Sequence, residues 1–323
     1  MITYNGNVLN CGGWLNAVPT PCPTTLPANT LRCRFVEGTA PVSTYGTWTK
    51  VVGVEDNLWD FYRSNNSWDS ALAGEVNMTD VVAAGDLSSV TYTDGLFVNC
   101  TKLKSVCDLD LQASTLMSNM FFNCQNLLHA PNIITGNGLT STYKMFGGCS
   151  SLLDVPLYNT SHVTKMDYMF YGCSALTAIP LYNTASVTEM SAMFSGCRSL
   201  VSVPDFNTAN VMYMLNMFYD CRALVEAPDL DTSSVTHMGA MFNGCYSLKE
   251  VPLYDTHLVW NVSEMFFYCY KVESGSLALY QQMSTQQYPP TSYSNCFTNC
   301  GIDTVTGAAE LAQIPTSWGG TMS

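Results

Sequence analysis

Cysteines that recur at a fixed interval are the residues of this chain with the greatest chemical potential. The chain has 14 cysteines among 323 residues. Eight of them close a phrase of the type Met-Phe-x-x-Cys, and successive copies lie 24 or 25 residues apart: Cys100, Cys124, Cys149, Cys173, Cys197, Cys221, Cys245 and Cys269. Metal binding requires clusters such as Cys-x-x-Cys, which the sequence lacks. We therefore interpret these residues as buried thiols, with disulfides between copies as the alternative.

The remaining cysteines leave other pairings open. Cys11, Cys22 and Cys33 are spaced by 11 residues, and Cys296 and Cys300 lie four apart. Either group can form a disulfide in an oxidising environment. The four histidines fall in different positions of the repeat and form no ligand set: His129, His162, His237 and His257. We expect no metal and no cofactor.

Carboxylates recur in pairs that resemble a catalytic arrangement. Asp205 and Asp229 occupy equivalent positions of adjacent copies, as do Glu226 and Glu250. Glycosidases use two carboxylates, so a glycan-processing enzyme is one alternative. A repeat in register creates such pairs automatically, and the sequence contains no nucleophile elbow and no phosphate-binding loop. We expect that the protein is not an enzyme.

The elements that position these residues come from the 24-residue repeat. A period in the twenties is typical of a solenoid, in which each repeat packs on its neighbours. In the copy that starts at Cys173, an extended run precedes a stripe spaced i, i+3, i+6 and i+7: Val187, Met190, Met193 and Phe194. That spacing predicts a helix, and Ser186 with Glu189 fits a capping box. Each repeat is thus predicted to hold one short strand and one short helix.

Comparison of the copies indicates which side chains face outward. The residue two positions after each repeat proline is always apolar and is predicted to be buried: Tyr158, Tyr182, Phe206, Leu230 and Tyr254. The residue one position after it is Leu in three copies and Asp in two, which predicts exposure. We expect a binding surface on this face, the alternative being a merely solvated face: Pro180, Leu181, Asp205, Glu226, Asp229, Glu250 and Leu253. The threonines in register are predicted to form a hydroxyl ladder and to cap the helices: Thr160, Thr184, Thr208, Thr232 and Thr256.

The chain divides by pattern into three parts. Residues 1–75 lack the phrase and are expected to form a small β-containing cap or attachment domain, with strands over 31–37 and 50–54. Residues 76–272 carry the repeats. Residues 273–323 are expected to hold an irregular last copy and a cap, with a helix over 274–288 and a closing segment over 307–315.

Composition excludes several partners. The formal net charge of -13 disfavours nucleic acid and anionic lipid, which both require basic surfaces. No segment approaches the ~18 apolar residues of a membrane span, so we expect no membrane insertion. The first residues, MITYNGNVLNCGG, have neither the basic nor the apolar region of a secretory signal, and we expect none.

The phrase DTSSVTHMGAMFNGC at 231–245 closely resembles the BspA-type leucine-rich repeat. The resemblance implies a right-handed α/β repeat solenoid of leucine-rich repeats, capped at both ends. It also implies an interaction scaffold, because such repeats occur in bacterial surface adhesins and in phages of gut Bacteroidales. Residues 28–68 resemble a segment that precedes repeat arrays in crAss-like phages.

We expect a phage virion protein, associated with the tail or capsid and active in host-surface adhesion or in assembly. Its partners would be other virion proteins or a host-surface protein or glycan. The alternative is a BspA-like adhesin on the bacterial cell surface. Whether the chain forms a homo-oligomer stays open.

Overall fold

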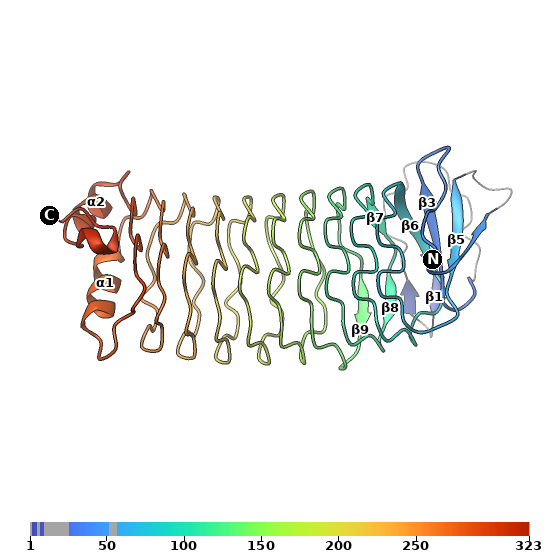
Figure 1. Cartoon of the computed structure of the whole chain (residues 1–323), viewed down its shortest axis with the longest axis horizontal. Helices are drawn as coiled ribbons and strands as arrows, with labels where there is room; N and C mark the ends of the chain where they lie inside the picture. Colours follow the sequence, from blue (N-terminus) through green and yellow to red (C-terminus); the bar gives the residue numbers. More distant parts are fainter. Residues whose placement is uncertain (1, 5–6, 10–25, 52–56, 323) are drawn as a thin grey trace. The chain divides into compact units, whose positions relative to one another are not determined.

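The computed structural model describes residues 2–4, 7–9, 26–51 and 57–322 (Figure 1). The chain forms two compact units, Met1–Thr160 and Ser161–Ser323. The predicted division at residues 75 and 272 stays a prediction. Cys11 and Cys22 lie outside the described residues, as do positions 52–54 of the second predicted strand.

The first unit contains the described β-strands. A five-stranded sheet has the order β4-β5-β3-β6-β7. Its strands are β3 (Thr30–Phe35), β4 (Thr47–Lys50), β5 (Leu58–Tyr62), β6 (Met78–Ala84) and β7 (Ser105–Val106). Strand β3 is antiparallel to β5 and β6, and β6 is parallel to β7. The strand predicted over 31–37 is confirmed by β3.

Two smaller sheets complete the strands of this unit. Strands β1 (Ile2–Tyr4) and β2 (Asn7–Leu9) pair antiparallel, and β8 (Leu109–Leu111) and β9 (Ile133–Thr135) pair parallel. Aromatic rings pack together at the main sheet: the buried Phe61 ring lies 4.8 Å from that of half-buried Trp48 and 5.5 Å from that of buried Trp68.

The helices predicted in every repeat are absent from the described repeats. In the copy that contains Met190, alternate amides donate to the next copy rather than to their own segment. The Ala192 N–H bonds to Leu215 O at 2.7 Å and the Phe194 N–H to Met217 O at 2.9 Å. The intervening amides close turns three residues back, as in Cys197 N–H to Phe194 O at 2.9 Å. An α-helix needs each amide to bond four residues back within the same segment.

The expected α/β leucine-rich-repeat solenoid, with a strand and a helix in each repeat, is therefore wrong. Each Met-Phe segment is a run of turns, and Ala192 and Gly196 have left-handed backbones with φ of 53° and 79°. A left-handed residue interrupts any helix. The extended run around each proline from Pro156 onward forms no regular strand in the described residues, because proline donates no ladder hydrogen bond.

α-Helices occur only near the C-terminus of the described chain. They are α1 (Ser276–Thr285) and α2 (Val305–Leu311), followed by a 3-10 turn at Thr316–Trp318 (Figure 1). The helix predicted over 274–288 is confirmed by α1. Glu310 of α2 accepts hydrogen bonds from the Ser276 hydroxyl at 2.7 Å and from the Leu277 amide at 3.1 Å. The Leu277 N–H lies in the first turn of α1 and has no acceptor within that helix, so α2 supplies one.

Within the second unit the apolar core repeats with the copies. The rings of Phe170, Phe194, Phe218 and Phe242 stack in sequence with centroids 5.8, 5.5 and 5.2 Å apart. Each of these rings is fully buried, and burial of such large apolar area is the main stabilising contribution available to the chain.

The repeat cysteines lie in the same core. The thiol of Cys197 donates to Phe170 O and that of Cys221 to Phe194 O, both at 3.1 Å. Burial raises the pKa of both thiols, so they stay protonated. The interpretation as buried thiols is confirmed. Cys33, Cys296 and Cys300 are also buried and free.

Candidate functional site

The predicted binding face is exposed in the second unit. We call Leu181, Asp205, Asp229 and Leu253 the leucine–aspartate column. Leu181 is 59% exposed and Leu253 is 63% exposed, and both aspartates are exposed. The next residue in each copy is at most 5% exposed: Tyr182, Phe206, Leu230 and Tyr254. Both the inward and the outward predictions are confirmed, because successive side chains of an extended segment point to opposite sides.

The two aspartates of the column are adjacent. The Asp229 amide donates to Asp205 Oδ1 at 2.9 Å, which occupies one oxygen of Asp205. In the next copy, the Tyr254 hydroxyl donates to Pro228 O at 2.7 Å. Burial raises the pKa of Tyr254, and the charges of Asp229 and Asp205 raise it further. The centre of the column is therefore negatively charged, with leucines in the copies on either side.

The other predicted residues lie around the column. Glu226 and Glu250 are exposed, and Pro180 is half-buried. Glu250 forms a backbone bridge with Ser274. The Lys249 amide donates to Val225 O at 3.0 Å, so Glu226 and Glu250 also occupy equivalent positions of adjacent copies, but no hydrogen bond or ion pair of the described residues joins their carboxylates.

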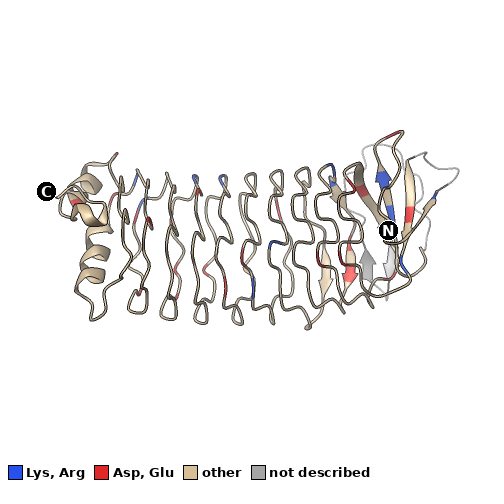
Figure 2. Cartoon of the chain, in the orientation of Figure 1, with Lys and Arg blue, Asp and Glu red and all other residues tan. Residues whose placement is uncertain are grey.

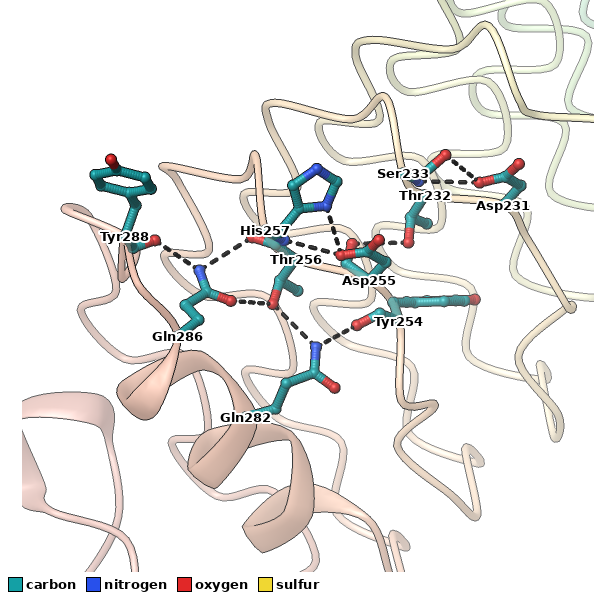
Figure 3. Close-up of polar contacts among 10 residues, drawn as sticks. All are labelled: Asp231, Thr232, Ser233, Tyr254, Asp255, Thr256, His257, Gln282, Gln286 and Tyr288. Carbon is teal, nitrogen blue, oxygen red and sulfur yellow. Dashed lines mark hydrogen bonds and ion pairs between the residues drawn. The ribbon is translucent and has the colours of Figure 1, made fainter.

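Buried threonines fix the backbone beside the column (Figure 3). The hydroxyl of each donates to a carbonyl of the next copy at 2.8 Å: Thr184 to Asn207, Thr208 to Asp231 and Thr232 to Asp255. All three are at most 2% exposed. The predicted hydroxyl ladder is confirmed, although these threonines precede turns and cap no helix. Breaking one of these bonds would leave a buried hydroxyl unpaired, which carries a desolvation penalty, so the bonds keep the backbone in place.

The turn after each threonine is closed by the residue before it. Asp231 Oδ1 accepts from the Ser233 amide at 3.0 Å, and Asp255 Oδ1 accepts from the His257 amide at 3.0 Å (Figure 3). These are Asx turns. The carboxylates of Asp231 and Asp255 thus hold the backbone.

Helix α1 supplies the partners that a further copy would provide. Gln282 Nε2 donates to Tyr254 O at 2.7 Å and to the Thr256 hydroxyl at 3.1 Å. Gln286 Oε1 accepts from the Thr256 hydroxyl at 2.9 Å, and its Nε2 donates to Thr256 O at 3.1 Å (Figure 3). The last threonine of the ladder is therefore satisfied by the side chains of Gln282 in α1 and of Gln286, the residue that follows the helix.

Sequence reasoning missed a second surface group, in which one residue, His237, is half-buried and the others are exposed. We call it the aromatic column: Met212, Tyr213, His237 and Trp260. The His237 ring lies 5.1 Å from Tyr213 and 4.4 Å from Trp260. Met212, Tyr213 and Trp260 are 41%, 37% and 47% exposed. Burial lowers the pKa of His237, which favours its neutral form. The available signal was variation among copies at two adjacent positions, one held by Met212 and Trp260 and the next by Tyr213 and His237, which the helix prediction concealed.

The described residues lack two further kinds of feature. No group of three or more His, Cys, Asp or Glu side chains there is placed to hold a metal ion. Across the same described ranges, no helix has the length and apolar character needed to cross a membrane.

The fold and the surface define a repeat protein whose copies bond to one another through backbone amides and buried hydroxyls. The family model described as "Mycoplasma protein of unknown function, DUF285" matches this chain three times, over residues 60–134, 140–249 and 205–299. The chain belongs to this repeat family, which is related to BspA-like repeats. No curated protein and no solved structure matches the chain significantly.

Proposed function

We propose that the chain is a non-enzymatic interaction scaffold and that the leucine–aspartate column binds a macromolecular partner. The exposure of Leu181 and Leu253 around the Asp205–Asp229 pair is the observation that supports this proposal. Binding surfaces combine apolar side chains with complementary charge. A backbone already ordered by buried threonines loses little conformational entropy on binding.

The proposed setting is a phage virion, where the chain would be part of the tail or capsid and act in host adhesion or in assembly. Its partner would then be another virion protein or a host-surface protein or glycan that presents apolar and basic groups. The likeness of 231–245 to BspA-type repeats and of 28–68 to crAss-like phage segments supports this setting. A bacterial cell-surface adhesin is the alternative that the same scaffold would serve.

Mass spectrometry of purified virions tests the setting. We expect the chain among the virion proteins and its gene beside portal, tail or capsid genes. Absence from virions would refute the phage assignment. Recovery of the chain by surface proteolysis of intact bacterial cells, without phage genes nearby, would support the adhesin instead.

A paired substitution tests the column. Leu181→Ser with Leu253→Ser removes both exposed apolar side chains, and we expect binding of the labelled protein to virions or host cells to weaken about tenfold or more. The matched control is Val305→Ser, which changes an 89% exposed apolar residue of α2. Unchanged binding by the double variant, with an unfolding curve like that of the wild type, would refute the role of the column.

A further inference from the structure

Two exposed arginines and two half-buried tyrosines form a stripe in another position of the repeat. Arg198, Arg222, Tyr246 and Tyr270 each follow the cysteine of their copy, and we call them the guanidinium–tyrosine stripe. Figure 2 shows how sparse charged residues are along the repeats. A pair of arginines in adjacent copies is therefore a distinctive feature of a chain with only 12 Lys and Arg residues.

One carboxylate orients both guanidinium groups. Arg198 Nε donates to Asp220 Oδ2 at 2.8 Å, and Arg222 Nε donates to Asp220 Oδ1 at 2.7 Å. Asp220 is itself held by its backbone, which donates to Asn243 O at 2.7 Å. Burial raises the pKa of Asp220, but hydrogen bonds from Arg222 and Arg198 outweigh it, so the net shift is downward. The carboxylate thus stays ionised.

The two arginines keep free donors and excess charge. Their side chains are 56% and 46% exposed, whereas that of Asp220 is 15% exposed. Arg222 makes one further contact, from Nη2 to Asp220 Oδ2 at 3.4 Å. In the described part of the chain the remaining N–H groups of both arginines have no hydrogen-bond partner. Two cations against one anion leave a local positive charge with donors directed to solvent, a geometry that suits an oxyanion.

The tyrosines continue the stripe as a row of half-buried rings in contact with one another. The Arg222 guanidinium lies 5.3 Å from the Tyr246 ring centroid, a cation–π arrangement that further orients it. The Tyr246 and Tyr270 rings are 5.3 Å apart and tilted by 31°. Tyr268 extends the group, with its ring 5.5 Å from Tyr270 at 32°. Tyrosine rings combine an apolar face with a hydroxyl that can bond to ligand or water.

We propose that the guanidinium–tyrosine stripe binds an anionic polysaccharide. A carboxylate or sulfate group of the sugar chain accepts hydrogen bonds from Arg198 and Arg222, and the apolar C–H groups of an adjacent sugar ring pack on the exposed parts of the Tyr246 and Tyr270 rings. An acidic peptide would satisfy the arginines but offers no such C–H groups beside its carboxylate for the neighbouring tyrosines. The overall charge of -13 repels polyanions. At physiological salt this repulsion is screened beyond about 8 Å, so the two arginines dominate the electrostatic interaction once a ligand is in contact with them.

Titration of the full chain with defined oligosaccharides tests this site by calorimetry. The probes are oligogalacturonate for carboxylates, a heparin-derived oligosaccharide for sulfates, and a cello-oligosaccharide as the neutral reference. We expect the wild type to bind at least one anionic probe more tightly than the neutral one. Binding of oligogalacturonate alone would identify the carboxylate as the group recognised, and binding of the heparin fragment alone would identify the sulfate.

Three variants separate the site from general charge. Arg198→Gln with Arg222→Gln is expected to weaken binding about tenfold or more, because charge-assisted hydrogen bonds are lost. Tyr246→Leu is expected to weaken oligosaccharide binding while leaving inorganic sulfate binding unchanged. Lys249→Gln is the control, since Lys249 is 55% exposed and similarly paired, with Glu273 at 2.8 Å. It is expected to bind like the wild type.

Several results would overturn the proposal. These are no binding of either anionic probe, equal binding of the neutral probe, an equal loss in Lys249→Gln, or tighter binding of poly-glutamate than of both oligosaccharides. Circular dichroism of each variant confirms folding. The proposal is independent of the leucine–aspartate column, so Leu181→Ser with Leu253→Ser is expected to leave oligosaccharide binding unchanged.

Discussion

The buried hydroxyl of Thr232 offers a direct test of what holds adjacent copies together. Thr232→Val keeps the shape of the side chain and removes the hydrogen bond to Asp255 O, which is 2.8 Å long. In the described residues that carbonyl accepts no other hydrogen bond, so the change leaves it unsatisfied. Losing the bond and orphaning the acceptor costs about 2–3 kcal/mol, and burial of one more methyl group recovers about 0.8 kcal/mol. We expect a net loss of about 1–2 kcal/mol in the free energy of unfolding.

Thr188→Val is the matched control. The Thr188 hydroxyl also donates to the preceding copy, to Thr164 O at 3.3 Å, but that bond is solvent-exposed. The same carbonyl still accepts from the Thr188 amide at 3.0 Å. We expect a loss within about 0.5 kcal/mol. Urea unfolding followed by circular dichroism measures both variants. Equal losses in the two variants would refute the reasoning that buried hydroxyl bonds, rather than threonine shape, stabilise the stack.

Three further predictions follow from buried groups and from α1. Burial raises the pKa of Cys100 to about 12, so the folded state favours the protonated thiol. The free energy of unfolding that this thiol contributes below pH about 9 should therefore fall as the pH rises toward 12. Urea midpoints that stay constant over this range would contradict the prediction. Burial and then the charge of Glu189 raise the pKa of Asp167 to about 6, so this group favours folding below its unfolded value of 3.8 and loses that contribution as the pH rises through 6. Asp167→Asn should therefore raise the free energy of unfolding at pH 7 by about 1–2 kcal/mol and leave it unchanged at pH 3, as measured by urea titration. Gln282→Ala removes the hydrogen bonds from α1 to Tyr254 and Thr256 and should lower the free energy of local unfolding by about 1–2 kcal/mol. The control Gln287→Ala, which lies beyond the helix, should change it little. Hydrogen exchange at the last copies measures both, and equal protection in the two variants would count against this role of α1.

Much of the candidate site was predictable because equivalent positions can be compared between the repeat copies of the one sequence. A position occupied by Leu181 in one copy and Asp205 in the next must accept both side chains, which only solvent does readily. The aromatic column and the guanidinium–tyrosine stripe also vary between copies, so the same comparison could have marked their positions as exposed. It could not show contacts between copies, because nothing in a single copy shows that Arg198 and Arg222 share one carboxylate.

The sequence by itself determined the register of the repeat and the burial of its side chains. Tyr182 and Cys197 face inward because their types and recurrence match an apolar interior, and burial depends mainly on side-chain chemistry. The backbone conformation was decided only by tertiary structure. The spacing of Val187, Met190 and Phe194 fits a helix and a run of turns equally well, since both bring every third or fourth residue to one side. The difference lies in where an amide finds its acceptor: Ala192 bonds to Leu215 in the next copy, and that neighbour exists only once the copies have stacked.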